Sequence, residues 1–167
     1  MSDGDFYDEH DAGEQWGTPE WIWKPLAGAL NGFDLDPASG AETIPIADTR
    51  YTVEDDGLSQ EWFGDVWLNP PYGRSFNRTW AEKAKSESHR ESVDTLTALV
   101  PSSTGSNWFQ ETYADADYMT HVSGRVQFHG AGDTSATFYN VIATWGDVPD
   151  EYIDALNEIG EVYQRVV

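Results

Sequence analysis

The 167-residue sequence has no cysteine and little positive charge. The absence of cysteine excludes disulfide bonds and thiolate metal sites. No apolar run approaches the roughly 20 residues that a membrane-spanning helix needs. The N-terminus is acidic, whereas a secretion signal begins with a basic and then an apolar region. We therefore expect a soluble, cytoplasmic protein with no membrane partner.

Two common ligand signatures are also missing. The histidines are scattered at His10, His89, His121 and His129 and have no metal-ligand spacing, so we expect no metal site. A glycine-rich dinucleotide fingerprint is absent as well, because Gly40 is the only glycine close behind the strand predicted at 33–36.

The charge balance bears on possible partners. Lysine and arginine number 9 against 30 aspartates and glutamates, which gives a formal net charge of −21. This disfavours nucleic-acid binding at ordinary salt, because phosphate affinity comes from basic side chains that release condensed counterions. The chain either binds no nucleic acid, binds through a small basic patch, or works at very high salt. At molar salt the Debye length is about 3 Å, so carboxylates on the surface repel each other little. Acidic residues from Asp3 to Glu161 favour the third interpretation, a protein of an extreme halophile or of its virus.

Apolar periodicity and turn residues predict alternating helices and strands. Thr18 with Pro19 and then Ser75 are predicted helix starts, and Pro25 is a point where the first helix can bend or break. Helices are predicted over about 20–30, 76–88 and 103–112 and from 149 onwards, with Val162 on the apolar face of the last. Strands are predicted at 33–36, 65–68, 95–100, 118–122, 125–128 and 137–145.

This order predicts a three-layer α/β/α sandwich whose last strands include antiparallel pairs. The length suits one domain. We expect residues 1–15 to form an acidic, flexible N-terminal segment and residues 16–167 to form a single catalytic domain.

The most specific stretch is Asn69-Pro70-Pro71-Tyr72, which follows an apolar strand and precedes Gly73. Pro71 has a fixed φ and no N–H, and it restricts Pro70, so carbonyls there point away from a ladder. Asn69 adds an amide oxygen, and Tyr72 adds an aromatic ring. We expect a rigid, exposed loop that can hold a planar group with an exocyclic NH2. The alternative is a proline turn with a packed tyrosine.

Asn-Pro-Pro-Tyr at a strand end resembles the catalytic motif of S-adenosylmethionine-dependent methyltransferases that act on planar amines. These act on adenine N6 or cytosine N4 in DNA, or on protein glutamine. Further marks in order resemble the small phage-type DNA N6-adenine methyltransferases (Dam-like) over residues 16 to about 145. The marks are Trp16-Gly17-Thr18-Pro19, Phe33-Asp34-Leu35-Asp36-Pro37-Ala38, Tyr51-Thr52, Asp55-Asp56-Gly57-Leu58, Trp62, Trp67-Leu68-Asn69-Pro70-Pro71-Tyr72-Gly73, Trp80, Lys83-Ala84, Leu99-Val100-Pro101, Trp108-Phe109 and Gly124-Arg125-Val126-Gln127-Phe128. The resemblance implies a Rossmann-like methyltransferase sheet with antiparallel strands at its C-terminal end.

The resemblance also implies an S-adenosylmethionine site. Thr18 and Pro19 would line its methionine end, with Trp16 nearby. Asp36 would bind the ammonium group directly or through water, and Pro37 and Ala38 would shape the loop. Asp55 or Asp56 would meet the ribose or the adenine edge, and Leu58 would pack on the adenine. For the two aspartates, a plain surface role is the alternative.

The implied substrate is an adenine flipped out of double-stranded DNA. Asn69 and the Pro70 carbonyl would accept its amine hydrogens, and Tyr72 would stack on its ring. DNA contacts are expected from Gly73, Arg74, Arg78 and Arg125, although Arg74 and Arg78 can instead pair with neighbouring carboxylates. Alternatives are an enzyme that uses the same loop on cytosine N4 or on protein glutamine, and a catalytically silent α/β binding module.

Overall fold

The computed structural model describes residues 17–40, 44–128 and 138–167. The acidic segment predicted at 1–15 and Trp16 lie outside the described residues. Within these ranges, the longest helices are far shorter and more polar than a bilayer crossing requires.

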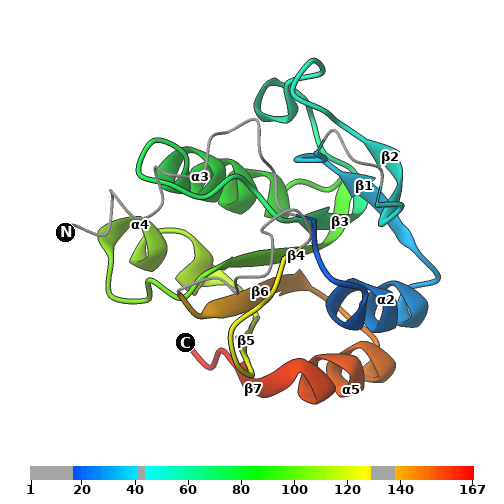
Figure 1. Cartoon of the computed structure of the whole chain (residues 1–167), viewed down its shortest axis with the longest axis vertical. Helices are drawn as coiled ribbons and strands as arrows, with labels where there is room; N and C mark the ends of the chain where they lie inside the picture. Colours follow the sequence, from blue (N-terminus) through cyan, green and yellow to red (C-terminus); the bar gives the residue numbers. More distant parts are fainter. Residues whose placement is uncertain (1–16, 41–43, 129–137) are drawn as a thin grey trace.

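The described residues form a seven-stranded sheet in the order β2-β1-β3-β4-β6-β5-β7 (Figure 1). The neighbouring strands β2, β1, β3 and β4 run parallel, and β6 runs antiparallel to both β4 and β5. β7 pairs antiparallel with β5, so β2 and β7 are the two edges of the sheet. The strands are β1 (Phe33–Asp36), β2 (Ala47–Arg50), β3 (Gly64–Leu68), β4 (Val93–Pro101), β5 (Tyr118–Val122), β6 (Asn140–Gly146) and β7 (Gly160–Gln164).

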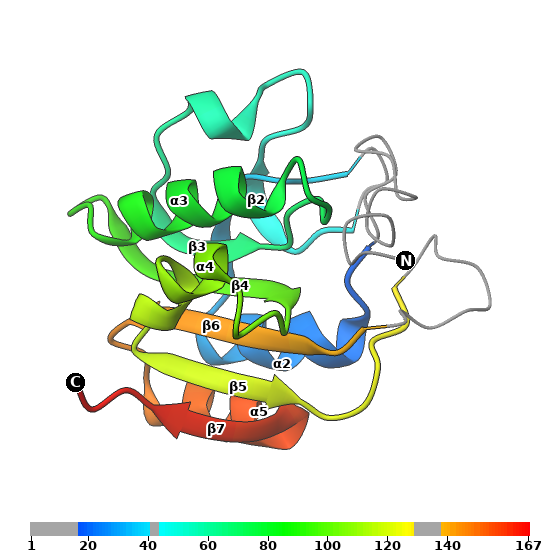
Figure 2. The same ribbon diagram turned by 90° about the vertical axis from the view of Figure 1, so that its left-hand side faces the viewer.

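Helices lie on both sides of this sheet. Figure 2 shows α3 and α4 on the side of the sheet that faces the viewer and α2 and α5 behind the sheet. The α-helices are α2 (Glu20–Ala29), α3 (Asn77–Ser88), α4 (Asn107–Gln110) and α5 (Asp150–Ile159), and two 3-10 turns are η1 (Gly57–Ser59) and η2 (Tyr113–Asp115). The result is a mixed α/β fold whose antiparallel strands come from the C-terminal part of the chain, as the sequence predicted.

Two hydrophobic clusters explain this layering, because side chains alternate between the faces of a strand. In β3, Val66 and Leu68 belong to the cluster that contains Trp80 of α3. Trp67, which lies between them, belongs to the cluster that contains Ile22 of α2. Each helix thus covers apolar side chains that one face of the sheet would otherwise expose.

Pro25 lies inside α2 without ending it. A proline leaves the carbonyl four residues earlier without its helical donor, and that carbonyl belongs to Trp21, which is about half exposed. Ile22 and Leu26 on the opposite side are fully buried. Their burial holds the helix together across the missing hydrogen bond.

Three sequence-based assignments of regular structure are wrong. The segment 125–128 is not a strand, although its burial alternates: Val126 and Phe128 are buried, whereas the residues before each are exposed. β2 was not predicted because it is a polar edge strand without apolar alternation. β7 was not predicted either, and Val162 lies on this strand rather than on a helix.

The predicted helix caps are also wrong. Pro19 rather than Thr18 is the N-cap of α2, and Phe76 rather than Ser75 is the N-cap of α3. The Oδ1 of Asn77 accepts a hydrogen bond of 3.2 Å from the Gly73 N–H, which ties the first turn of α3 to the residues before it.

The chain turns directly from α5 into β7 at Gly160. A Cβ at this position would lie 1.8 Å from the carbonyl oxygen of His121 on β5. Only a residue without a side chain lets the strand begin so close to its partner. This contact explains why the helix can end one residue before pairing begins.

Docking of α5 gives a test of the hydrophobic cluster that also contains Ile22 of α2. Leu156 is fully buried in this cluster, whereas Ile153 on the same helix is only partly buried. We expect Leu156→Ala to lower the free energy of unfolding by about 2–5 kcal/mol, because it removes buried methyl groups and leaves a cavity. Urea unfolding followed by tryptophan fluorescence in molar KCl measures this loss. Ile153→Ala is the control, and an equal loss there would contradict the assignment.

Candidate active site

The predicted site lies at the carboxyl ends of the parallel strands. β3 pairs in parallel with β1 on one side and β4 on the other, so the loops after Asp36, Leu68 and Pro101 emerge at the same end of the sheet. Open α/β sheets bind ligands at the carboxyl ends of such strands. The structure thereby brings the loop after Asp36 next to the Asn69 loop, as the sequence predicted for this pair.

Asn69 is held on both sides of its amide. Its Nδ2 donates to the Thr18 hydroxyl at 3.2 Å, and its Oδ1 accepts from the Tyr72 hydroxyl at 2.8 Å. Thr18 is 2% exposed. The residue predicted as a helix cap therefore instead anchors the loop Asn69-Pro70-Pro71-Tyr72, here called the proline loop, from 51 positions away in sequence.

Pro70, Tyr72 and Gly73 are buried, and Asn69 and Pro71 are only partly exposed, so the prediction of an exposed loop is wrong. The largest of these buried side chains is that of Tyr72. It is 8% exposed, and its hydroxyl also lies 2.8 Å from the carbonyl oxygen of Leu99 on β4. Its ring contacts Phe128 and Phe138 edge-on, with centroid distances of 6.0 and 5.6 Å. The structure thus shows a packed tyrosine, and these neighbours occupy the surroundings of its ring.

Asp36 is a buried carboxylate at the end of β1. The residue is 7% exposed, and its Oδ1 accepts a hydrogen bond of 3.3 Å from the Ala38 N–H. Burial raises the pKa of Asp36 to about 7, against the weaker lowering effects of the Ala38 N–H and of the Arg50 guanidinium. Tyr51 fixes the loop, because its N–H donates to the Asp36 carbonyl and its own carbonyl accepts from Ser39.

A cavity of about 160 Å³ lies beside this loop. Its walls combine the loop after β1, the segment after β2, the proline loop and α3. The lining residues are Pro37, Ala38, Tyr51, Thr52, Val53, Asp56, Gly57, Leu58, Pro71, Phe76 and Trp80. Four residues predicted for cofactor binding thus share one cavity with one residue of the predicted catalytic motif. Sequence reasoning did not assign the aromatic walls, although Phe76 and Trp80 were predicted on one face of α3.

The two acidic residues before Gly57 have different surroundings. The Asp55 carboxylate accepts hydrogen bonds of 2.9 and 3.1 Å from the N–H and the hydroxyl of Thr52, which stabilises the turn. Asp56 instead lines the cavity. A Cβ on Gly57 would lie 1.9 Å from the Pro37 carbonyl oxygen, so this glycine is required by close packing of the two loops.

The basic residues predicted to contact DNA have mixed surroundings. Arg74 is exposed directly after the proline loop. Arg78 pairs with Glu111 at 2.7 Å and with Glu82 at 3.5 Å, which agrees with the salt-bridging alternative. The Arg125 guanidinium lies over the ring of Tyr139, 5.2 Å from its centroid.

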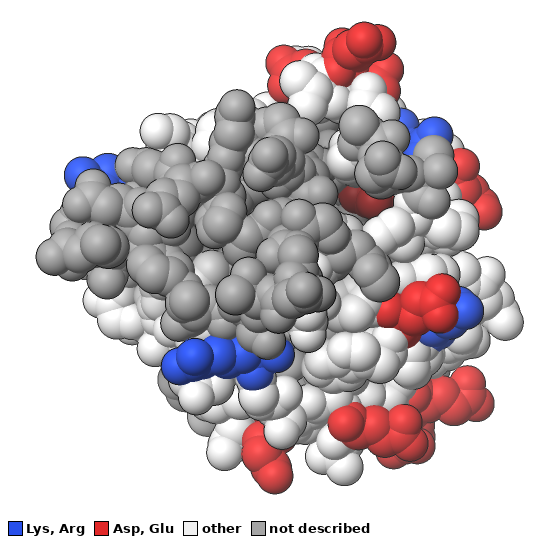
Figure 3. Space-filling view, in the orientation of Figure 1, with Lys and Arg blue, Asp and Glu red and all other residues white. Residues whose placement is uncertain are grey.

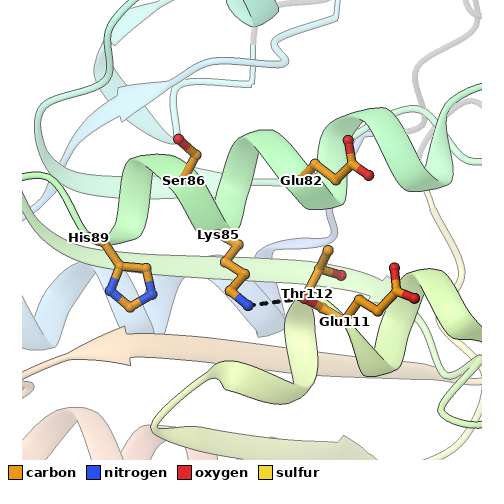
Figure 4. Close-up of a pocket in the computed structure, with 6 residues that line it drawn as sticks. All are labelled: Glu82, Lys85, Ser86, His89, Glu111 and Thr112. Carbon is orange, nitrogen blue, oxygen red and sulfur yellow. Dashed lines mark hydrogen bonds between the residues drawn. The ribbon is translucent and has the colours of Figure 1, made fainter.

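A second hollow of about 340 Å³ lies between α3 and the residues after α4 (Figure 4). Lys85 donates to the carbonyl oxygen of Glu111 there at 3.1 Å, and the His89 ring bonds to the Asp115 carboxylate at 2.8 Å. Its lining includes none of the residues predicted for the site. Among residues 17–40, 44–128 and 138–167, no group of three or more histidine or acidic side chains is placed to hold a metal ion.

Comparison with known proteins gives two matches. A family model described as DNA N-6-adenine-methyltransferase (Dam) matches residues 8–144, which include both site loops. The chain is also similar to the DNA N-6-adenine-methyltransferase of Escherichia phage T1, with 31% identity over 104 residues. That match covers 60% of this chain and 41% of the phage protein, so the chain spans less than half of that relative's length.

Removing the buried charge should stabilise the protein in a pH-dependent way. Because burial raises the pKa of Asp36 from 3.8 to about 7, the native state favours the protonated form. The protonated Asp36 leaves the native state fully stable below pH 3.8, the ordinary pKa. Ionisation of the buried carboxyl then removes stability as the pH rises through about 7. We expect Asp36→Asn to raise the free energy of unfolding at about pH 8 by up to roughly 4 kcal/mol, and the gain to shrink toward about pH 4.

Urea unfolding across this pH range in molar KCl measures the effect. The control is Asp48→Asn, which removes a carboxylate of the same kind from the exposed surface of β2. An equal gain from Asp36→Asn at both ends of the range would show that the buried charge is not its cause.

Proposed function

The chain belongs to the DNA N-6-adenine-methyltransferase (Dam) family, and we propose that it transfers a methyl group from S-adenosylmethionine to the N6 amine of adenine in double-stranded DNA. The observation that carries this proposal is that three features meet at the carboxyl ends of the parallel strands. These are the oriented Asn69 amide, the buried carboxylate of Asp36 and the apolar cavity that Pro71 shares with the loop after β1. The helices on both faces of the sheet support a three-layer, Rossmann-like methyltransferase domain.

The residues at these strand ends fit S-adenosylmethionine chemically. An ammonium beside Asp36 would offset the cost of ionising a buried carboxylate. The apolar walls of the cavity, including Ala38 and Leu58, suit a planar adenine, and Asp56 suits a ribose hydroxyl. At about 160 Å³ the cavity is smaller than the roughly 300–1,000 Å³ of whole ligand pockets, so it would hold one part of the cofactor.

The remaining cofactor contacts follow the family resemblance. Thr18 and Pro19 would lie at the methionine end, which the Thr18–Asn69 hydrogen bond supports. Trp16 stays a proposed neighbour. Pro37 would shape the loop, and Asp55 would hold the turn that presents Asp56. When bound, S-adenosylmethionine supplies a methyl group on a positively charged sulfur.

The protein's own contribution to transfer would be orientation. The Asn69 Oδ1 and the Pro70 carbonyl would each accept one hydrogen of the adenine amine. This directs the nitrogen lone pair away from the protein oxygens and toward the methyl donor, and such positioning can supply much of the rate enhancement. The extra proton on the methylated nitrogen leaves to solvent. No histidine or cysteine base is needed in this scheme.

The flipped base must also find room beside Tyr72. Stacking of a base on an aromatic ring contributes about 1–3 kcal/mol. Because Phe128 and Phe138 lie against the Tyr72 ring, a base can stack on it only if one of them moves. We therefore propose that entry of the adenine is coupled to a side-chain movement in this aromatic group.

DNA contacts are proposed for the side chains of Arg74 and Arg125, which are exposed. Gly73, which the resemblance also implies for this role, is buried, and its N–H donates to Asn77. Arg78 would reach phosphate only by leaving its ion pairs. Acidic side chains cover several regions of the surface, including the loop between β2 and β3 and the region of α5 (Figure 3). We propose that the protein acts intracellularly in a high-salt host, where this charge is screened.

Methyl transfer from labelled S-adenosylmethionine to duplex DNA in molar KCl tests the function. We expect label on adenine N6 in an adenine-containing duplex and none when adenine is replaced by an analogue without the amine. Digestion to nucleosides and chromatography identify the methylated base. Label on cytosine or on protein would indicate the alternative amine substrates, and no label would favour a silent binding module.

The amine-acceptor role predicts a selective loss. Asn69→Ala should reduce methyl transfer by at least about 100-fold, the scale for removing one transition-state hydrogen bond. Cofactor affinity, measured by calorimetry, should change little, because Asp36 and the cavity remain. Asn157→Ala removes an exposed amide on α5 and is the matched control. Transfer that survives in Asn69→Ala would refute the role.

A further inference from the structure

Asn140 is a buried amide next to the proposed catalytic loop. It is the first residue of β6 and is 1% exposed. Its Nδ2 lies 3.3 Å from the Tyr72 hydroxyl and 3.2 Å from the Val100 carbonyl oxygen. Within the described residues, its Oδ1 has no hydrogen-bond partner. A buried, half-satisfied amide costs stability, so a role beyond packing would explain its presence in a largely apolar strand.

Neighbouring groups fix which way this amide points. The Val100 carbonyl can only accept a hydrogen bond, so the nitrogen of Asn140 must face it. The same nitrogen then donates its second hydrogen to the Tyr72 hydroxyl. Exchanging the amide oxygen and nitrogen would place two oxygens against each other at the Val100 carbonyl. The Val100 carbonyl of β4 thus determines that Asn140 presents its N–H, and not its oxygen, to the Tyr72 hydroxyl.

The backbone at this point is itself well defined. Asn140 lies opposite Pro101 in the antiparallel β4–β6 ladder, and the Ser102 N–H donates to the Tyr139 carbonyl next to it. Pro101 and Asn140 therefore form a pair that exchanges no backbone hydrogen bonds. The proline costs nothing in this ladder, and the two side chains lie close together.

The Tyr72 hydroxyl joins three groups with a single proton. It accepts from Asn140, so its own proton goes to one of two acceptors at 2.8 Å, the Asn69 Oδ1 or the Leu99 carbonyl. A substrate amine that donates to Asn69 can be accommodated when the hydroxyl turns its proton to Leu99. The hydroxyl then exchanges its hydrogen bond to Asn69 for one to Leu99 and keeps the same number of hydrogen bonds.

We propose that Asn140 is a positioning residue for methyl transfer, acting through the Tyr72 hydroxyl on the Asn69 amide. This inference rests on the proposed function. By filling the acceptor side of the hydroxyl, Asn140 restricts its proton to the two acceptors and keeps the hydroxyl beside Asn69. The hydrogen bond from the Asn69 Nδ2 to Thr18 fixes the other side of the amide. The Asn69 Oδ1 is thereby held in position to accept a hydrogen of the substrate amine.

A double-mutant cycle tests this path. We expect Asn140→Ala to lower kcat about tenfold or more, with KM for DNA and cofactor affinity changed less than about twofold. In a Tyr72→Phe background, which lacks the hydroxyl, the same substitution should change kcat less than about twofold. Equal factors in both backgrounds would overturn the proposal, because a purely structural role does not depend on the hydroxyl.

A matched control separates this effect from loss of a buried polar group. Thr120 on β5 is fully buried, and its hydroxyl also lacks a hydrogen-bond partner in the part of the chain that the structure describes. Thr120→Val keeps the shape of the side chain and should leave kcat unchanged. A loss of kcat equal to that of Asn140→Ala would count against a specific path through Tyr72.

A second measurement does not depend on activity. In protein with isotope-labelled asparagine, the Asn69 side-chain amide signals, assigned with Asn69→Ala, should shift in Asn140→Ala and stay in place in Thr120→Val. Unshifted Asn69 signals in both variants would refute the path. If the unmodified protein transfers no methyl group but these signals shift, the proposed function fails while the coupling of Asn140 to Asn69 stands. If the protein is active and kcat is unaffected by Asn140→Ala, the positioning role alone fails.

Discussion

The hydrogen bonds of the Tyr72 hydroxyl connect the proline loop after β3 to the neighbouring strand β4. Proline residues cannot secure this loop through N–H donors of their own. The loop is therefore fixed by the side chains on either side of the prolines, Asn69 and Tyr72. Thr18, just before α2, adds a contact from a third segment of the chain. The geometry of the site thus depends on two linked side chains: the Asn69 amide, which bonds to Thr18, and the Tyr72 hydroxyl, which bonds to Leu99.

Burial has opposite effects on two parts of this site. At Asp36 it makes the ionised state costly, which suits a carboxylate that waits for a cationic group. At Tyr72 it fixes the hydroxyl and restricts access to the ring. In the proposed mechanism, a cationic ligand would offset the cost of ionising Asp36, and the side chains around Tyr72 would move to admit a base.

The parts of the fold that follow apolar patterns were predictable. β1 and β5 were predicted with their observed bounds, and α3 was displaced by one residue at its start. The two edge strands were not predicted, because β2 is polar and β7 follows α5 without a loop. The segment at 125–128 shows the converse error, since it has the burial pattern of a strand but does not form one. Pairing depends on distant neighbours, which a local pattern does not contain.

The candidate site was predictable as a set of segments but not as a set of contacts. The sequence placed Asp36 and Asn69 at strand ends, and the structure brings their loops together. It gave no sign that Thr18 would bond to Asn69 or that the Tyr72 ring would be buried. Asn140 was also overlooked, although a single amide at the start of an apolar strand is a usable signal. Such contacts arise from chain crossings over more than 50 residues.

The edge strands of the sheet have a particular role in the high-salt setting that we propose. An exposed edge strand can pair with another molecule, and charged side chains are a common protection against this. Molar salt weakens that protection, because it screens the repulsion between like charges. β2 and β7 have only four and five residues, so each offers few free backbone groups to a second copy. Resistance to aggregation in such a solvent would then come from the shortness of the edges, and lengthening either strand would carry a risk that added surface charge could not remove.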